Sequence, residues 1–481
     1  MVAHLRCERF SSVGIPRLQL SWESLRTRAA LPGFVSPLHG ICDGTSSATI
    51  GGSTIGGLSM MRRTRPVLLL VLVPLLLMLG LSACGNGGSS GGTVTLKFYH
   101  WIGADAGPVI AEIDKKFEAE NPNIKIEFTT APTDQYQTVI KTRLASGDAP
   151  DVFGVFPGAW LATYGAKPGY LVDLSNESWV SSLNAGAKGV SSYNGKVYAL
   201  PMSQNVIGVV YNKDLFARAG VTVPTNWDEF LAACQKLKAA GTTPLALGIK
   251  DQWVDQLIPY AMAPTAIYRS DQAFDADMFA GKATFDNSPW KQMMQDYLSL
   301  NQQGFFNSGA LGTTYQQTQD LITTGKAAMV VNGNWILAPL EQADPSLKLG
   351  MFPLPYNKAG ETPWVSAAVG EEMGISSTSK HIAEAKKFVA FWARPDIMKL
   401  YLDAKKAFPA QSNVTPNIDP AAAEMLPALN AGSYNFLDQK WPTGVQDVML
   451  KDIQSVYAGT MTIDQMLQDM DTTFAAKKDT V

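Results

Sequence analysis

Residues 93–155 decide the fold, because short apolar segments alternate there with amphipathic ones. The apolar segments are TVTLKFY (93–99), IKIEF (124–128) and DVFGV (151–155), and the amphipathic ones between them are PVIAEIDKKFEAE (108–120) and YQTVIKTRLA (136–145). The first kind predicts strands, and apolar residues spaced three or four positions apart predict helices. The resulting β-α-β-α-β order predicts an α/β fold in which helices cover a parallel sheet.

The carboxyl ends of parallel strands are the usual place for a ligand site. Trp101 follows the first predicted strand, and the segment from Phe156 to Trp160 follows the third. We therefore expect both to lie near a cleft.

Further elements are indicated downstream. Thr225-x-x-Asp228 and Thr462-x-x-Gln465 have the spacing of a capping box, which begins a helix. The apolar run 327–331 predicts a strand, and the apolar spacing within 381–393 predicts a helix.

Composition excludes several classes of protein. The chain has 481 residues, which suggests two or three domains, and a net charge of -3 from 39 basic and 42 acidic side chains. A nucleic-acid binder needs a basic stripe, which this balance argues against. Four cysteines are too few for a disulfide scaffold, and four histidines make a histidine-rich metal site or a catalytic triad hard to build. We expect no cofactor and no metal.

A basic block, MRRTR (61–65), precedes an apolar run from Val67 to Leu81. The run is short for a membrane span and fits the apolar region of a secretory signal. It ends in LSAC (81–84), which resembles the lipobox of bacterial lipoproteins, where a cysteine takes a lipid after cleavage. The resemblance implies a lipoprotein signal peptide over 60–83 and a lipid on Cys84. The alternative is an uncleaved membrane anchor.

The residues on either side of this signal complete the N-terminal organisation. Residues 84–92, CGNGGSSGG, are expected to be the lipidated cysteine and a flexible tether. Residues 1–59 show little sustained periodicity, and a signal should begin at a start codon. We therefore expect translation to start at Met60 or Met61, with 1–59 as a non-native extension. Peptides from residues 1–59 in native protein would contradict this expectation.

Several segments, in order and at family-like spacing over roughly residues 93–475, resemble one family. They are FYHW (98–101), FEAENP (117–122), GDAPDV (147–152), YNGKVYALP (193–201), VYNKDLF (210–216), TNWDEF (225–230), the segment 329–335 and GIS (374–376). The family is the extracellular solute-binding proteins of ABC importers, in the sugar-binding group that includes the maltose-binding protein.

The resemblance implies the type II periplasmic-binding-protein fold, with two lobes joined by a hinge and a mostly parallel sheet flanked by helices in each. One lobe would hold 93–204 and 365–408, and the other 205–364 and 409–481. A sugar or oligosaccharide would sit between the lobes, and a membrane permease would read the closed form. The protein would be a monomer, anchored by a lipid on Cys84 to the extracytoplasmic side of the cell membrane, which is the periplasmic side if the organism has an outer membrane. It would not be an enzyme.

A sugar site needs aromatic plates for C–H faces and carboxylates or amides for hydroxyls. Trp335 is the strongest candidate, because it follows a strand and an Asn-Gly-Asn turn where the family places a stacking aromatic. For Trp101, the sequence favours a place at the cleft rim and a place in the core equally. Tyr136 and Trp441 are further aromatic candidates for which core packing is the alternative.

Polar candidates come from three segments. Gln204 and Asn205 precede a buried strand, and hinge backbone is the alternative partner for their amides. Asp251 and Trp253 follow a predicted strand where the family often has a carboxylate and an aromatic. Gly370, Glu371 and Glu372 replace a family Gly-Gly turn, and we expect only one of the two glutamates to face the cleft, because consecutive residues point apart.

Two competing functions stay open at this point. The same fold with a carboxylate in the cleft would also suit a polyamine or another small polar solute. A lipid-anchored glycoside hydrolase also uses aromatic plates and acids, but it needs two carboxyl groups at a defined separation, which adjacent Glu371 and Glu372 do not supply.

Overall fold

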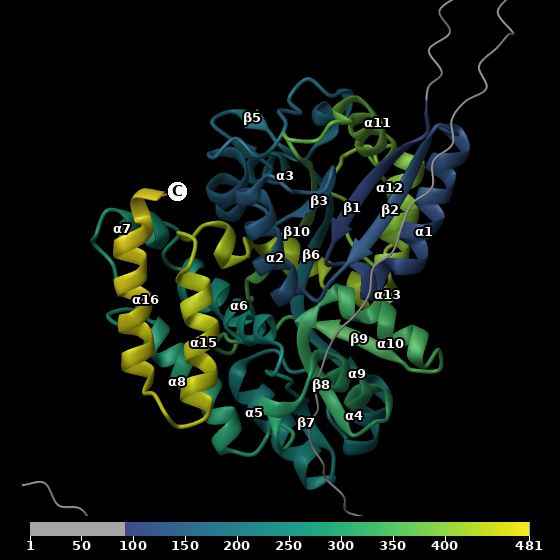
Figure 1. Ribbon diagram of the computed structural model, residues 1–481. Coiled ribbons are helices and arrows are strands. Elements are labelled where there is room, and N and C mark those ends of the chain that lie inside the picture. The colour runs from purple at the N-terminus through teal and green to yellow at the C-terminus, as the bar shows by residue number, and fades with distance from the viewer. Residues whose placement is uncertain (1–91, 481) are drawn as a thin grey trace, which may run out of the picture. The chain divides into compact units, whose positions relative to one another are not determined.

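The computed structural model describes residues 92–480 (Figure 1). The predicted extension 1–59, the predicted signal peptide 60–83 and the predicted lipidation site Cys84 lie outside the described residues. Within the described part, no helix combines the length and the apolar character needed to cross a membrane.

A nine-stranded sheet runs through residues 92–480 in the order β2-β1-β3-β10-β6-β8-β7, with β11 beside β10 and β9 beside β6. Its strands are β1 Val94–His100, β2 Ile124–Thr130, β3 Val152–Val155, β6 Ala199–Asn212, β7 Thr243–Ala246, β8 Ala327–Gly333, β9 Leu349–Phe352, β10 Val365–Ile375 and β11 Ser433–Tyr434. The strands β4 Ser192–Tyr193 and β5 Lys196–Val197 form a separate hairpin.

Parallel pairing joins β1 to β2 and to β3, which confirms the parallel β-α-β-α-β order expected for residues 93–155. The strand β7 also pairs in parallel with β8. The two long strands β6 and β10 pair antiparallel with each other, and they pair antiparallel with β8 and β3 respectively. The predicted strand at 327–331 is confirmed as β8.

Helices cover this sheet. They are α1 Gly103–Glu120, α2 Thr133–Ser146, α3 Ala185–Val190, α4 Lys213–Ala219, α5 Trp227–Ala239, α6 Leu257–Ala263, α7 Phe274–Phe279, α8 Trp290–Gln302, α9 Tyr315–Thr323, α10 Leu337–Ala343, α11 Ile382–Trp392, α12 Pro395–Lys405, α13 Pro420–Ala423, α14 Leu426–Ala431, α15 Val445–Tyr457 and α16 Ile463–Lys477. Short 3-10 or π turns are η1 Leu161–Ala166, η2 Ser178–Ser182, η3 Gln252–Gln256, η4 Pro264–Tyr268, η5 Ala310–Gly312, η6 Asn334–Ile336, η7 Leu437–Gln439 and η8 Lys478–Thr480.

Two helix starts test the capping predictions. Thr462 and Gln465 form the predicted capping box at the start of α16. At α5 the cap is one residue later than predicted, because the Asn226 side chain accepts the hydrogen bond from the Glu229 N–H. Thr225 instead donates to the Glu229 carboxylate at 2.8 Å, so it lies just outside the helix. Asparagine is at least as good a cap as threonine, which accounts for the shift.

Apolar side chains gather in two groups on either side of the crossing strands. The first core packs β1, β2 and β3 against helices that include α1, α11 and α12, with Phe98 and Phe388 at its centre. The second core packs β7 and β8 against helices that include α5, α8, α15 and α16, with Phe230 and Met470 fully buried in it. Figure 1 shows α1, α11 and α12 beside β1 and β2, and α15 and α16 side by side.

The strands β6 and β10 connect the two cores. Leu200 of β6 packs in the first core and Ile207 in the second, whereas Val365 of β10 packs in the second and Met373 in the first. The pairing of β10 with β6 shifts register on both sides of Glu371. The chain therefore crosses between the cores at an irregular point of the sheet, and this point positions the site.

Candidate functional site

A cleft of about 1020 Å³ opens between the two cores. Residues of the first core form one wall, residues of the second core form the facing wall, and β6 and β10 form the floor. Its lining includes Trp101, Asp105, Asp134, Phe156, Trp160, Tyr164 and Lys405 from the first side, Asp251, Trp253, Tyr260, Tyr315, Trp335, Phe436 and Asp438 from the second, and Asn205, Ile207, Gly370 and Glu371 from the floor.

Aromatic rings line the first wall at the carboxyl ends of two parallel strands. Trp101 follows β1 and Phe156 follows β3, and their rings stack at 4.0 Å with only 3° between the planes. Trp160 lies 5.6 Å from Phe156, and Tyr164 lies 5.6 Å from Trp160 one helical turn further on. The expectation that Trp101 and the segment 156–160 lie at a cleft is therefore confirmed.

The second wall also presents aromatic rings. Trp335 lines the cleft directly after β8 and meets Phe436 edge-on with 6.4 Å between centroids. Gly333 makes this possible, because a Cβ at that position would collide with the Trp335 ring. Trp253 meets Tyr315 edge-on at 4.9 Å, and Asp251 beside it accepts the Tyr315 N–H at 2.7 Å. Asp251, Trp253 and Trp335 thus share one wall, as the sequence indicated.

The floor is a hydrogen-bonded polar group. Glu371 is 5% exposed, and one of its oxygens accepts hydrogen bonds of 2.7 Å from Ser203 and from Tyr401. The other oxygen accepts one from Asn205 at 3.3 Å, and Asn205 in turn accepts one from Asn334 at 3.2 Å. These bonds fix the carboxylate and leave acceptor capacity toward the cleft.

The register shift in β10 separates the two glutamates. Glu371 lines the cleft, but Glu372 is 0% exposed and its carboxyl lies 2.5 Å from the Ser191 hydroxyl. Burial raises the pKa of Glu372 well above its usual value, and the hydrogen bond from Ser191 lowers it in part. The inclusion of Glu372 among the ligand-binding residues is therefore corrected. Gly370 leaves room for the Asn205 side chain, because a Cβ at position 370 would collide with the Asn205 amide.

Three other expected site residues lie away from the cleft lining. Tyr136 is fully buried, and its hydroxyl donates to the Gly154 carbonyl at 2.6 Å. Trp441 is fully buried beside Trp290, 5.5 Å between ring centroids. For Tyr136 and Trp441 core packing is correct. Gln204 pairs through its backbone with Phe408, which is the hinge-backbone alternative that the sequence left open.

Sequence reasoning missed several cleft residues because they do not follow strands. Asp105 lies in the first turn of α1, and Lys405 is the last residue of α12. Tyr260 sits in the apolar helix α6 and donates to the Asp438 carboxylate at 2.9 Å. Burial first, and then the nearby Asp447 carboxylate, raise the pKa of Asp438 to about 6. No local pattern distinguishes these residues from ordinary helix residues.

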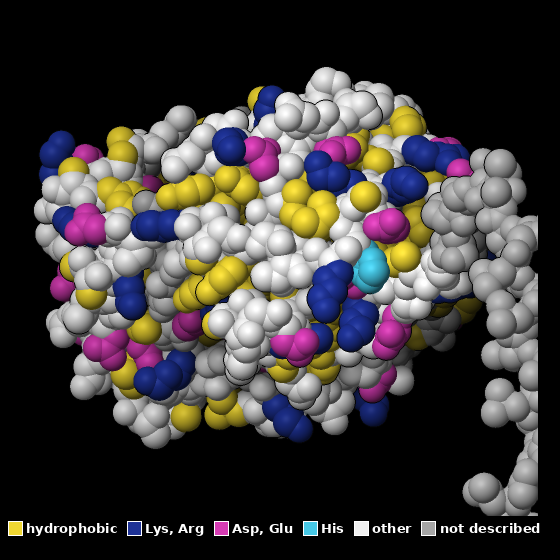
Figure 2. Space-filling view, turned by 45° about the horizontal axis from the view of Figure 1, so that its top comes forward, with side chains coloured by type: hydrophobic (Ala, Val, Ile, Leu, Met, Phe, Trp, Pro, Cys, Tyr) yellow, Lys and Arg dark blue, Asp and Glu magenta, His cyan; other side chains and the backbone are white. Residues whose placement is uncertain are grey.

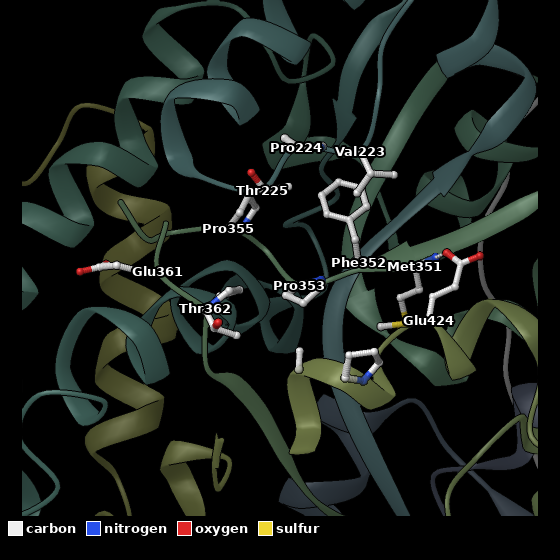
Figure 3. A pocket seen from close by; sticks show the side chains of 13 residues that line it. Val223, Pro224, Thr225, Met351, Phe352, Pro353, Pro355, Glu361, Thr362 and Glu424 are labelled. Atoms are coloured by element: carbon white, nitrogen blue, oxygen red, sulfur yellow. Dashed lines mark hydrogen bonds between the residues drawn. The ribbon is translucent and has the colours of Figure 1, made fainter. Parts of the chain in front are cut away.

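A second, smaller hollow of about 390 Å³ lies on the second-core side (Figure 3). It is lined largely by prolines and by Phe352, which is buried. Its two carboxylates are already paired, Glu361 with Arg269 and Glu424 with Lys213, each at 2.6 Å. It therefore offers a ligand neither an open aromatic face nor a free carboxylate, unlike the cleft.

The surface carries charges of both signs. Figure 2 shows basic and acidic side chains intermixed over one face, with no continuous area of one sign. Among residues 92–480, no group of three or more histidine, cysteine, aspartate and glutamate side chains is placed to hold a metal ion.

Comparison with known proteins places this architecture in one family. The family model described as bacterial extracellular solute-binding protein matches residues 103–399. The multiple sugar-binding protein of Streptococcus mutans is 30% identical over 299 residues, which cover 61% of this chain and 70% of that protein. The melibiose/raffinose/stachyose-binding protein MelE of Bacillus subtilis is 27% identical and covers 71% of this chain and 81% of its own.

Solved structures agree with the sequence relatives. RafE in complex with raffinose is 27% identical, covers 80% of this chain and 100% of its own, and superposes with a TM-score of 0.69. A sugar transporter protein of Bacillus licheniformis in complex with stachyose, 23% identical with the same coverage, superposes with a TM-score of 0.70 and supports the fold alone. The two-lobed α/β fold expected from the sequence is thereby confirmed.

Proposed function

Because this chain belongs to the bacterial extracellular solute-binding proteins, we propose that it captures a sugar or oligosaccharide between two lobes and delivers it to the permease of an ABC importer. Its relatives and its fold are those of sugar-binding ABC-type substrate-binding proteins, not of enzymes. The glycoside-hydrolase alternative is therefore set aside. The family is extracytoplasmic, so capture takes place outside the cytoplasm.

The cleft carries this proposal, because its walls and its floor match the two kinds of surface of a sugar. Phe156, which is stacked on Trp101, on one wall and Trp335 on the other offer aromatic surface for C–H groups. Glu371 and Asn205 on the floor offer a fixed carboxylate and amide for hydroxyls. A cleft of about 1020 Å³ is at the upper end of the range for small-molecule sites, which favours an oligosaccharide.

Closure of two lobes is the proposed mechanism of capture. The lobes would hold 93–204 with 365–408 and 205–364 with 409–481, and the two cores support this division, although Val365 and Ala368 pack with the second core. The walls already meet at the rim, where the Asp134 carboxylate on α2 accepts the Gln252 N–H at 3.1 Å. A ligand that touches both walls stabilises the closed form, because only differential contact shifts such an equilibrium.

The remaining steps are proposed from the sequence. A lipid on Cys84 would hold the protein at the outer face of the cell membrane, and the glycine- and serine-rich tether would let it reach the permease. The protein would work as a monomer, because both walls of the cleft come from one chain.

A ligand screen by thermal shift tests the proposal. Raffinose, stachyose and xylo-oligosaccharides form the sugar arm, and spermidine and free amino acids form the other arm. A ligand that prefers the native state raises the melting temperature with its concentration. A shift with a saccharide supports the proposal, whereas a shift with spermidine alone would replace the sugar by a polyamine on the same fold.

A further inference from the structure

The Lys405 ammonium is an unusual group for its position. The residue is only 3% exposed and lies at the end of α12, yet its side chain lines the cleft. Its ion-pair partner is Asp105 on α1, with 3.6 Å between Nζ and the carboxylate oxygen, which is longer than a hydrogen bond. Among residues 92–480, the hydrogen bonds include none donated by this ammonium.

An ammonium has three donors, and burying it is costly unless they are used. Most long-chain cations avoid this cost by extending into water. Lys405 lies on the same face of α12 as Tyr401, because the two residues are four positions apart. Tyr401 is fully buried and donates a hydrogen bond of 2.7 Å to Glu371. The helix therefore directs Lys405 into the cleft beside the floor.

Two carboxylates of the cleft lining lie near this position. Asp105 pairs with Lys405, and Glu371 accepts the hydrogen bond of Tyr401, one turn earlier on α12. Burial first, and then the Glu371 and Asp105 carboxylates, raise the pKa of Tyr401 well above its usual value. A ligand group here meets one donor flanked by two acceptors. An anionic ligand group would be repelled by the carboxylates, whereas neighbouring hydroxyls donate to the carboxylates and accept from the ammonium.

We propose that Lys405 is a specificity-determining residue of the cleft, which donates to a hydroxyl oxygen of the bound saccharide while Asp105 and Glu371 accept from the adjacent hydroxyls. This inference rests on the proposed sugar-binding function. It assigns the polar part of the site to the side of the floor where α1 and α12 meet.

The chain offers a matched control in the next residue. Lys406 pairs with Glu341 and with Asp419 at 3.1 Å each, and it does not line the cleft. Lys405→Met removes the cleft donor and an ammonium that has no hydrogen bond. Lys406→Met removes two close ion pairs at a distance from the ligand.

The experiment measures both variants, and Lys405→Gln, in the full protein. Isothermal titration calorimetry with raffinose and stachyose gives affinity, and thermal unfolding without ligand gives stability. We expect Lys405→Met to weaken saccharide binding by at least about tenfold, as for a lost hydrogen bond to a charged group. Lys405→Gln should recover part of the affinity because it keeps a donor, and Lys406→Met should bind like wild type.

Saccharide binding by wild type separates this proposal from the function on which it rests. Without ligand, we expect Lys405→Met to melt close to wild type, because its pair with Asp105 is 3.6 Å long and the Asp105 side chain keeps 22% of its surface exposed, and Lys406→Met to melt lower. If saccharides bind wild type and Lys405→Met alike, Lys405 is a structural ion-pair partner and only this proposal is overturned. If no saccharide binds wild type, the proposed function fails and this proposal fails with it.

Discussion

Replacing Trp335 by alanine removes the aromatic plate on which the second wall of the cleft depends. The indole lies over the end of β8, meets Phe436 only edge-on at 6.4 Å, and leaves a face to the cleft. Its loss therefore removes ligand contact more than core packing. The floor at Glu371 and the first wall at Trp101 stay unchanged, so binding is weakened and not abolished.

The size of the effect follows from what one stacked ring contributes. An aromatic plate is worth about 1–3 kcal/mol in recognition, which converts to roughly a 5- to 150-fold rise in Kd. Trp335→Phe keeps a smaller plate, so its Kd should fall between those of wild type and Trp335→Ala. Thermal stability should change little, because the ring is only half-buried.

Isothermal titration calorimetry with the saccharide that gives the largest thermal shift measures this prediction. The matched control is Trp227→Ala on the same side of the molecule. Trp227 is also half-buried, packs against Phe230 at 5.3 Å and Tyr356 at 5.1 Å, and does not line the cleft. The reasoning is refuted if Trp335→Ala binds like wild type, or if Trp227→Ala loses as much affinity.

Three further predictions concern the floor, a buried acid and the anchor. Gly370→Ala should both lower the melting temperature and weaken saccharide binding, because the added methyl group collides with the Asn205 amide. Such overpacking costs about 1–3 kcal/mol. A saccharide affinity equal to that of wild type by calorimetry would contradict this prediction. Burial raises the pKa of the fully buried Asp255 to about 9. Its neutral form therefore stabilises the fold below about pH 4, and this stabilisation is lost as the pH rises toward 9. Asp255→Asn should flatten the dependence of the melting temperature on pH in that window, and a slope equal to that of wild type would refute this prediction. Cys84→Ser should release the protein from the membrane fraction into the soluble fraction, and retention in the membrane would contradict lipid anchoring.

The fold and the aromatic walls could be predicted from the sequence because they follow from local periodicity. The alternating segments gave the parallel order of β1, β2 and β3, and side chains that follow such strands reach one edge of the sheet. Trp101 and Trp335 were found in this way. Tyr136 carried a contrary pattern, since it shares one helix face with Ile140 and Leu144 in α2 and all three are buried.

The floor residues Asn205, Gly370 and Glu371 were expected at the site and line the cleft, but the choice between the two glutamates could not be predicted, because it depends on tertiary register. The register shift in the β10–β6 pairing decides which of Glu371 and Glu372 faces the cleft. The order of residues in this part of the chain does not predict that shift. Lys405 has ordinary helix neighbours, and only the packing of α12 on α1 brings it to Asp105. Residues that reach a site from helices need tertiary contacts, whereas residues that follow strands need only the strand order.

Small-angle X-ray scattering of the protein with and without saturating saccharide tests the central claim most directly, which is that two lobes close over a sugar. The account predicts that the radius of gyration falls when a saccharide that binds by calorimetry is added, and that the fall is lost in Trp335→Ala at the same concentration. Identical scattering profiles for free and saturated wild-type protein would contradict it.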